Sequence, residues 1–151
     1  MTYAANTDVS VERSRAELER TLNRYGASAF GYATRDELAT VVFELADRRI
    51  AFELPLPSRT DRKFTHHARG TRTTTAATAA WEQACRQRWR ALNLAVKAKL
   101  EAVEAGIAEF EDEFLAYIVL PGGGTMSDVA RPAIAHAYET GTMPALMAGP
   151  R

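Results

Sequence analysis

The sequence predicts an α+β fold in which an N-terminal helix and a long amphipathic helix cover one three-stranded antiparallel sheet. Two segments, residues 10–25 and the residues from 75 onward, repeat apolar side chains every three or four positions, the period of an α-helix. Between them, residues 28–56 alternate apolar and polar side chains, which is typical of strands. One or two further helices are expected towards the C-terminus.

Composition indicates one ordinary folded domain over residues 1–151. The chain is 46% hydrophobic and 25% charged, with nineteen basic and nineteen acidic side chains. This apolar fraction excludes a disordered chain, because burial can offset the entropy lost on folding. The longest nearly uncharged apolar run, residues 114–120, is far shorter than the roughly 18 residues of a membrane span. With no secretory leader visible and Cys85 as the only cysteine, we expect a cytoplasmic protein without disulfides.

The first helix and the strands have clear boundaries. Ser10 is a suitable N-cap for a helix over 10–25, and Gly26 can end it in the left-handed conformation. Polar turns at 35–37 and 47–49 divide residues 28–56 into a three-stranded β-meander, which Pro55 ends.

The strongest periodic signal begins after the threonines at 73–75 and predicts a long helix over 75–118, which Gly106 either kinks or divides in two. Its first 31 residues or so would extend about 46 Å, whereas short strands span only about 20 Å. Part of its apolar stripe must therefore meet the helix from Ile107 onward, the C-terminal helix or another subunit. We accordingly expect a homo-oligomer that self-associates through the long helix. A last helix is expected over 127–139, where Pro132 would be tolerated only in the first turn.

The zero net charge hides a strong segregation of charge along the chain. Residues 57–100 contain ten basic and two acidic side chains, and residues 101–120 contain six acidic and no basic ones. Residues 57–74 lack any periodicity and are predicted to form an exposed basic loop. Because local potential steers charged partners, the basic block points to an anionic one.

Enzymatic and metal-binding motifs are missing from the sequence. It contains no nucleophile elbow, P-loop, Rossmann fingerprint or zincin motif, so we expect no catalytic residue and no cofactor. His66 and His67 would point apart on an extended chain and are poor metal ligands. The acidic group at 109–113 is better explained as a solvated face or as a partner for the basic block. We therefore expect no metal site.

The basic block has the mixture of residues that binds a phosphate backbone: cations, hydroxyls, and aromatic rings on which unpaired bases stack. In this interpretation the loop arginines and lysine hold phosphates, Phe64 and the two histidines stack bases, and three arginines of the long helix extend the groove. The candidate residues are Arg59, Arg62, Lys63, Phe64, His66, His67, Arg69, Arg72, Arg86, Arg88 and Arg90.

A plainer interpretation of the helical part stays open. Arg86, Arg90 and Lys97 would lie roughly opposite the apolar stripe as an ordinary solvated face, supported by the i,i+4 pairs Glu82–Arg86 and Lys97–Glu101. The two tryptophans, Trp81 and Trp89, would then belong to the core.

Several stretches resemble a family of small, functionally uncharacterised proteins encoded by bacteriophages and prophages. They are residues 10–15, 24–27, 81–92, 97–107 and 110–114. The resemblance carries no activity and no site residue. It implies a protein acting in the host bacterial cytoplasm, on phage DNA metabolism or against a host pathway.

Taken together, these patterns predict a phage protein that binds single-stranded nucleic acid, DNA first of all, without sequence specificity, in DNA metabolism or annealing. The alternative is a phage-encoded interaction protein that inhibits a host or defence protein or sequesters a nucleotide signal.

Overall fold

A computed structural model describes residues 4–145 and confirms the α+β fold. Helix α1 (Val11–Arg24) is followed by the strands β1 (Ala29–Arg35), β2 (Leu38–Leu45) and β3 (Arg48–Pro55). The remaining elements are α2 (Arg62–Thr65), β4 (His66–His67), β5 (Gly70–Thr71), α3 (Thr74–Glu104), α4 (Phe110–Glu113), the 3-10 helix η1 (Leu115–Tyr117) and α5 (Met126–Thr140).

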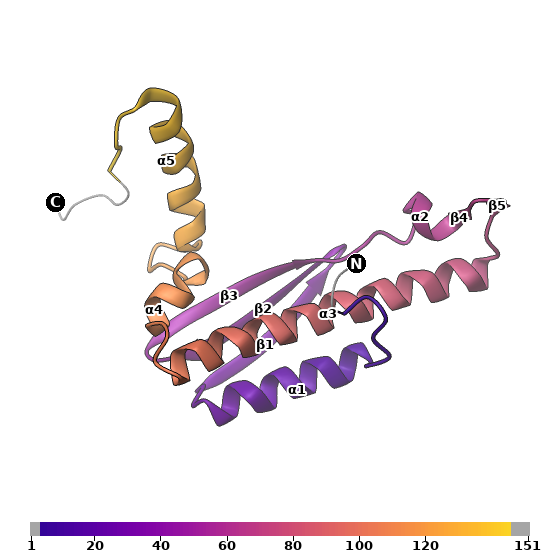
Figure 1. Cartoon of the computed structure of the whole chain (residues 1–151), viewed down its shortest axis with the longest axis horizontal. Coiled ribbons are helices and arrows are strands. Elements are labelled where there is room, and N and C mark those ends of the chain that lie inside the picture. The colour runs from indigo at the N-terminus through magenta and orange to yellow at the C-terminus, as the bar shows by residue number, and fades with distance from the viewer. Residues whose placement is uncertain (1–3, 146–151) are drawn as a thin grey trace.

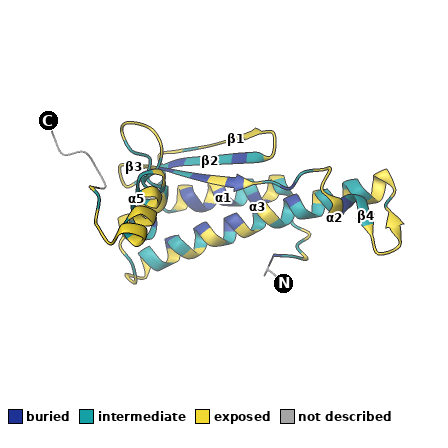
Figure 2. Cartoon of the chain, turned by 90° about the horizontal axis from the view of Figure 1, so that it is seen from above, coloured by how far each residue is buried: buried dark blue, intermediate teal, exposed yellow. Residues whose placement is uncertain are grey.

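The sheet is an antiparallel meander in the order β1-β2-β3, with Val41 of β2 opposite Tyr32 and Phe52. The turn between β2 and β3 places Ala46 and Asp47 at φ 52° and 59°, which matches the twist of a tight hairpin. Helices α1 and α3 lie in one layer on one face of this sheet (Figure 2).

The core lies between these two layers. Ala39, Val41 and Phe43 alternate along β2 and are buried, as the period-two pattern predicts. Trp89, fully buried on α3, belongs to the same cluster, together with Leu18 and Leu22 of α1 and Val96 and Leu100 of α3.

Polar contacts cap α1 and hold it against α3. Ser10 caps α1 as predicted, its hydroxyl accepting from the backbone N–H of Arg13 at 3.1 Å. At the far end of α1 the Tyr25 hydroxyl donates to the Glu101 carboxylate, a bond that raises the pKa of Tyr25. Between them the Arg90 guanidinium lies 2.7 Å from the Glu17 carboxylate.

The long helix ends well before residue 118, so of the two alternatives for Gly106 the structure shows division. Gly106 takes φ 72°, and the Gly106 and Ile107 N–H groups donate back to the Val103 and Ala102 carbonyls. This bonding pattern closes a helix at a left-handed glycine. Ile107 is consequently 81% exposed, while Phe110 and Phe114 turn back onto the core.

The N-terminal end of α3 extends beyond the sheet, as its length predicts (Figure 1). The segment that packs on this end of the helix is not one of those we expected. The segment expected to be a loop forms α2 and a small β4–β5 hairpin packed along α3, with Phe64 only 5% exposed. One aromatic side chain suffices to anchor this segment, and one residue gives no periodicity to detect. Because the chain itself covers the stripe of α3, the reason for expecting self-association through that helix no longer holds.

Helix α5 stands away from the sheet (Figure 1). None of its residues is buried, and Ile134 and Tyr138 are 53% and 89% exposed. Pro132 is the seventh residue of this helix rather than part of its first turn, which corrects our expectation. The exposure of the helix allows water to bond the carbonyl that Pro132 leaves without a donor. Within residues 4–145 no helix combines the length and apolar character needed to cross a membrane.

Candidate nucleic-acid interface

The loop candidates lie together on one projection, here called the cationic arm and defined as residues 59–73. It consists of the segment after β3, α2 and the β4–β5 hairpin, and it runs beside the N-terminal part of α3 beyond the sheet (Figure 1). Its cations are Arg59, Arg62, Lys63, Arg69 and Arg72, and its only acidic residue is Asp61. The structure therefore gathers half of the basic block into one place.

The exposed cations of the arm are open to a ligand. Within the described part of the chain, the side chains of Arg62 and Arg69 have no ion pair or hydrogen bond, and both are exposed. Lys63 lies 3.9 Å from Asp61, with both side chains at least half exposed, and such pairs contribute little. Arg72 is different, since its guanidinium donates to the Phe64 carbonyl at 3.4 Å and helps to hold the arm together.

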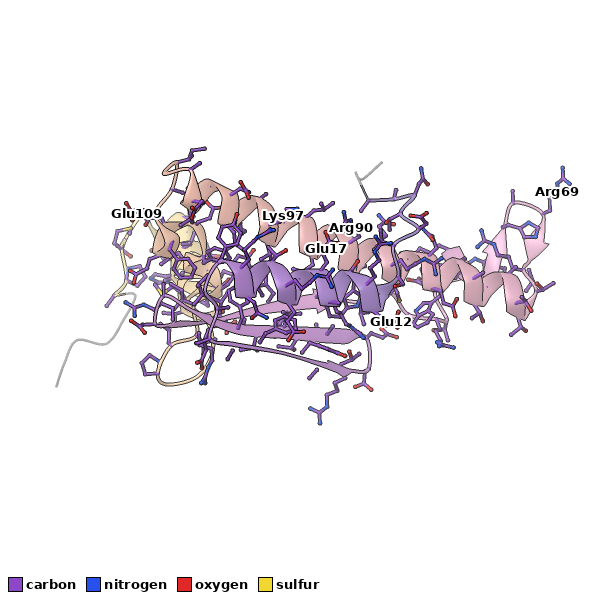
Figure 3. All side chains as sticks on the ribbon, turned by 90° about the horizontal axis from the view of Figure 1, so that it is seen from below. Glu12, Glu17, Arg69, Arg90, Lys97 and Glu109 are labelled. Atoms are coloured by element: carbon purple, nitrogen blue, oxygen red, sulfur yellow. The ribbon has the colours of Figure 1, made fainter. Side chains whose placement is uncertain are left out.

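The start of α3 adds to the positive potential of the arm. The Thr73 hydroxyl caps this helix by accepting from the Ala76 N–H, so the amino end of 31 residues of aligned peptide dipoles lies at the base of the hairpin. The acidic group of residues 101–120 lies towards the other end of the molecule: Figure 3 shows Arg69 and Glu109 at opposite ends of the long axis. The separation of charge in the sequence is thus also a separation in space.

The acidic end does not neutralise the arm. Two of its carboxylates form ion pairs, Glu111 with Arg48 at 2.6 Å and Glu113 with Lys99 at 3.3 Å. Neither Arg48 nor Lys99 belongs to the arm.

The aromatic candidates are mostly occupied by the fold. Phe64 is buried against α3, so its predicted role in stacking bases is not available in this structure. His66 shares a 2.7 Å hydrogen bond with the Thr65 hydroxyl, and the Nδ1 atom of the exposed His67 accepts from the Arg69 N–H at 3.0 Å. Of the three, His67 alone presents an exposed ring.

The arginines of α3 do not extend the arm into a continuous groove. Arg90 pairs with Glu17 of α1, and Arg86 donates to the Gln83 side chain at 2.6 and 3.0 Å. Both lie on the side of α3 that faces α1, not opposite the apolar stripe as expected, and Figure 3 shows Arg90 beside Glu17. Arg88 is exposed but lies outside the arm, on α3. The pairs expected within the helix, Glu82–Arg86 and Lys97–Glu101, are not formed among the described residues.

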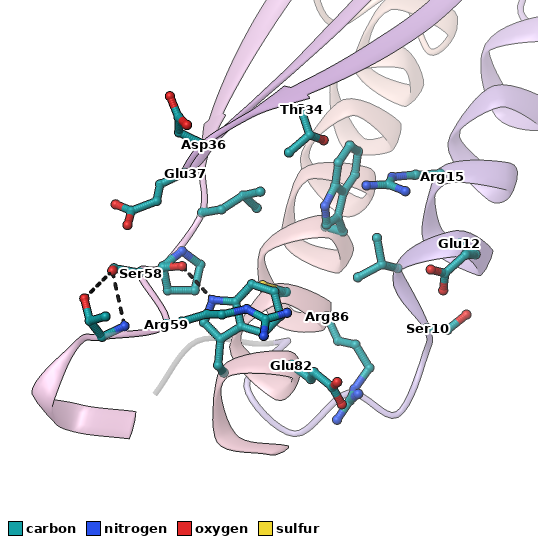
Figure 4. Close-up of a pocket in the computed structure, with 17 residues that line it drawn as sticks. Ser10, Glu12, Arg15, Thr34, Asp36, Glu37, Ser58, Arg59, Glu82 and Arg86 are labelled. Atoms are coloured by element: carbon teal, nitrogen blue, oxygen red, sulfur yellow. Dashed lines mark hydrogen bonds between the residues drawn. The ribbon is translucent and has the colours of Figure 1, made fainter. Parts of the chain in front are cut away.

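A cavity that the sequence did not predict adjoins the base of the arm (Figure 4). It has a volume of about 830 Å³ and lies among α1, the β1–β2 turn, the segment after β3, and α3. Arg59 of the arm stacks on the Trp81 ring at 4.1 Å, and Arg15 of α1 lies 4.3 and 4.4 Å from the rings of Tyr32 and Trp89. Arg15 could not be found from the sequence, because its only signal is proximity created by folding.

Cys85 lines this cavity but is 7% exposed, and loss of solvation raises the pKa of its thiol. A raised pKa leaves less thiolate at neutral pH, and thiolate is the reactive form. We expect maleimide to label Cys85 at pH 7.5 more slowly in the folded protein than in denaturant, because burial limits access to the sulfur and lowers its thiolate fraction. Equal rates, measured by mass spectrometry over time, would contradict the burial of this residue.

Comparison of the chain with protein-family models, with curated proteins and with solved structures finds no match. Fold and geometry define a two-layer α+β protein with a projecting cationic arm, and the phage context stays a prediction. No group of three or more metal-ligating side chains is brought together within residues 4–145.

Proposed function

We propose that this protein binds single-stranded nucleic acid without sequence specificity, and that the cationic arm holds the phosphates. The observation that carries the proposal is the exposure of Arg62, Lys63 and Arg69 on one projection without a strong acidic partner. Neutralising phosphates releases condensed counterions, so such a cluster gives affinity that does not depend on the bases. In the phage context implied by the sequence, this activity would serve DNA metabolism or annealing.

The local chemistry of the arm supports the proposal. The exposed threonines 71, 74 and 75 lie in or beside the arm, and their hydroxyls can donate to phosphate oxygens. His67 and the Trp81 ring offer flat surfaces for unpaired bases, which favours a single strand over a duplex. The opposite, acidic end repels phosphate and so orients the approach of a strand.

The direct test compares two variants with the same change in net charge. The arm variant is Arg62→Ala, Lys63→Ala and Arg69→Ala, and it keeps Arg72 because that side chain holds the arm together. The control is Arg13→Ala, Arg20→Ala and Arg131→Ala, three exposed cations elsewhere whose side chains have no ion pair or hydrogen bond among the described residues.

Affinity would be measured by fluorescence anisotropy with a labelled oligonucleotide of about 20 nucleotides, longer than the ~4–16 nucleotides of a typical site. We expect the arm variant to lose at least about tenfold in affinity and the control to stay close to the unaltered protein. A duplex of the same length should bind more weakly. Equal losses in the two variants, or no binding by the unaltered protein at low salt, would overturn the proposal.

A further inference from the structure

The cavity beside the arm has the size of a small-molecule site. Its volume of about 830 Å³ lies within the roughly 300–1,000 Å³ range of ligand pockets. Both tryptophans of the chain, Trp81 and Trp89, line it, and so do three arginines, Arg15, Arg59 and Arg86. Aromatic walls with a few cationic groups suit a ligand that is flat in one part and anionic in another.

Arg15 is the best-defined anion-binding group in the cavity. Its guanidinium is fixed by the Tyr32 and Trp89 rings, and Tyr32 and Trp89 themselves meet edge to face at 6.0 Å. Its Nε atom is buried and has no hydrogen-bond acceptor, and no carboxylate pairs with this side chain among the described residues. A buried donor on a charged group is costly to leave unpaired, and an oxyanion such as phosphate fits a guanidinium in its own plane.

Arg59 and Trp81 form the opposite wall. The Trp81 indole N–H donates to the Pro57 carbonyl at 2.7 Å, which fixes the orientation of the ring. Arg59 lies over this ring and has no ion pair within residues 4–145, so its guanidinium can move aside or bond a ligand while a planar base takes a place on the indole face. Figure 4 shows Arg15 and Arg59 on opposite sides of the cavity. The Trp89 ring is on the Arg15 side, since its centroid lies 4.4 Å from that guanidinium.

The acidic residues around the cavity add selectivity. Glu12, Asp36, Glu37 and Glu82 also line it. Figure 4 shows Asp36 and Glu37 at the rim, across the cavity from Arg15. Carboxylates accept hydrogen bonds from the amino and hydroxyl groups that a nucleoside carries besides its phosphate. They therefore favour a phosphorylated nucleoside over inorganic phosphate.

We propose that this cavity binds a nucleoside monophosphate, with the phosphate held by Arg15 and the base stacked at Trp81. The ligand is either a free nucleotide or a nucleotide unit of a bound strand, since both carry the same chemistry. This inference goes beyond the binding of a polyanion by the arm, because the exposed arm cations Arg62, Lys63 and Arg69 do not line the cavity.

The test uses tryptophan fluorescence, excited at a wavelength that the five tyrosines of the chain do not absorb, because both tryptophans line this cavity. AMP is the probe, with adenosine and inorganic phosphate as partial ligands. We expect AMP to change the emission saturably, and adenosine and phosphate to bind at least about tenfold more weakly. Arg15→Met keeps the length of the side chain without its charge, and we expect it to weaken AMP binding at least about tenfold, the effect of losing a charge-assisted hydrogen bond.

Two further measurements separate this inference from the proposed function. The arm variant should bind AMP as tightly as the unaltered protein, even if it loses the oligonucleotide. Competition of AMP by the oligonucleotide identifies a strand as the source of the nucleotide, and lack of competition identifies a free nucleotide; both support the site.

Three outcomes would overturn the inference: no saturable response to AMP, equal affinity for AMP and inorganic phosphate, or unchanged AMP affinity in a folded Arg15→Met variant. If circular dichroism shows Arg15→Met to be unfolded, Arg15→Lys takes its place under the same criteria, because lysine keeps a cation between the two rings but lacks the two-pronged donor geometry of a guanidinium.

Discussion

Replacing Phe114 with alanine is expected to lower the free energy of unfolding by about 3–5 kcal/mol, the usual cost of removing a buried phenylalanine. Phe114 is 0% exposed, and its ring meets Phe43 and Phe52 edge to face at 6.0 and 6.3 Å. Neither α4 nor η1 contains a buried residue of its own. Phe114 is therefore the main anchor of the chain that follows α3.

Urea unfolding followed by circular dichroism measures this effect. The neighbouring residue provides the control, because Leu115 is 49% exposed and its replacement by alanine should change stability by only about 0.5 kcal/mol. A loss below about 1 kcal/mol for Phe114→Ala would show that the α4–η1 segment does not pack on the sheet as described.

The affinity for a single-stranded oligonucleotide is expected to fall roughly 50-fold between about 50 and 200 mM salt. This figure follows from four phosphate contacts, each releasing about 0.7 of a counterion from a single strand. The contacts are those of Arg62, Lys63, Arg69 and Arg72, whose guanidinium keeps N–H donors besides the one bonded to the Phe64 carbonyl. Anisotropy titrations at several salt concentrations give the slope, which should be about −3 on logarithmic axes. A slope near zero would mean that apolar or base contacts dominate the binding.

Local patterns predicted the elements of this fold well. The cap at Ser10 and the alternation of Ala39, Val41 and Phe43 depend on neighbours in the chain, so the sequence displays them directly. The end of α3 was harder to predict. The apolar spacing continues across Gly106 to Phe110, although the helix ends at Glu104. Spacing alone does not distinguish a continued helix from a second element that packs on the same core.

The candidate site was predictable only in part. The cations of the arm could be identified from the sequence, because they lie within fourteen consecutive residues, 59–72, and so stay close together in the fold. The sequence could not show that the arginines of α3 are occupied elsewhere, because Arg90 pairs with Glu17, which is 73 residues away in the chain. Phe64 was misjudged for a similar reason: a single aromatic residue in a polar segment is equally consistent with an exposed stacking surface and with an anchor.

The central claim, that the arm holds the phosphates of a strand, is tested most directly by the salt slope of the two triple variants. If the arm makes these contacts, the slope for Arg62→Ala, Lys63→Ala and Arg69→Ala should shrink from about −3 to about −1, because three of four contacts are lost. The Arg13, Arg20 and Arg131 control should keep the full slope. Identical slopes for the two variants would place the contacts elsewhere on the molecule and contradict the account.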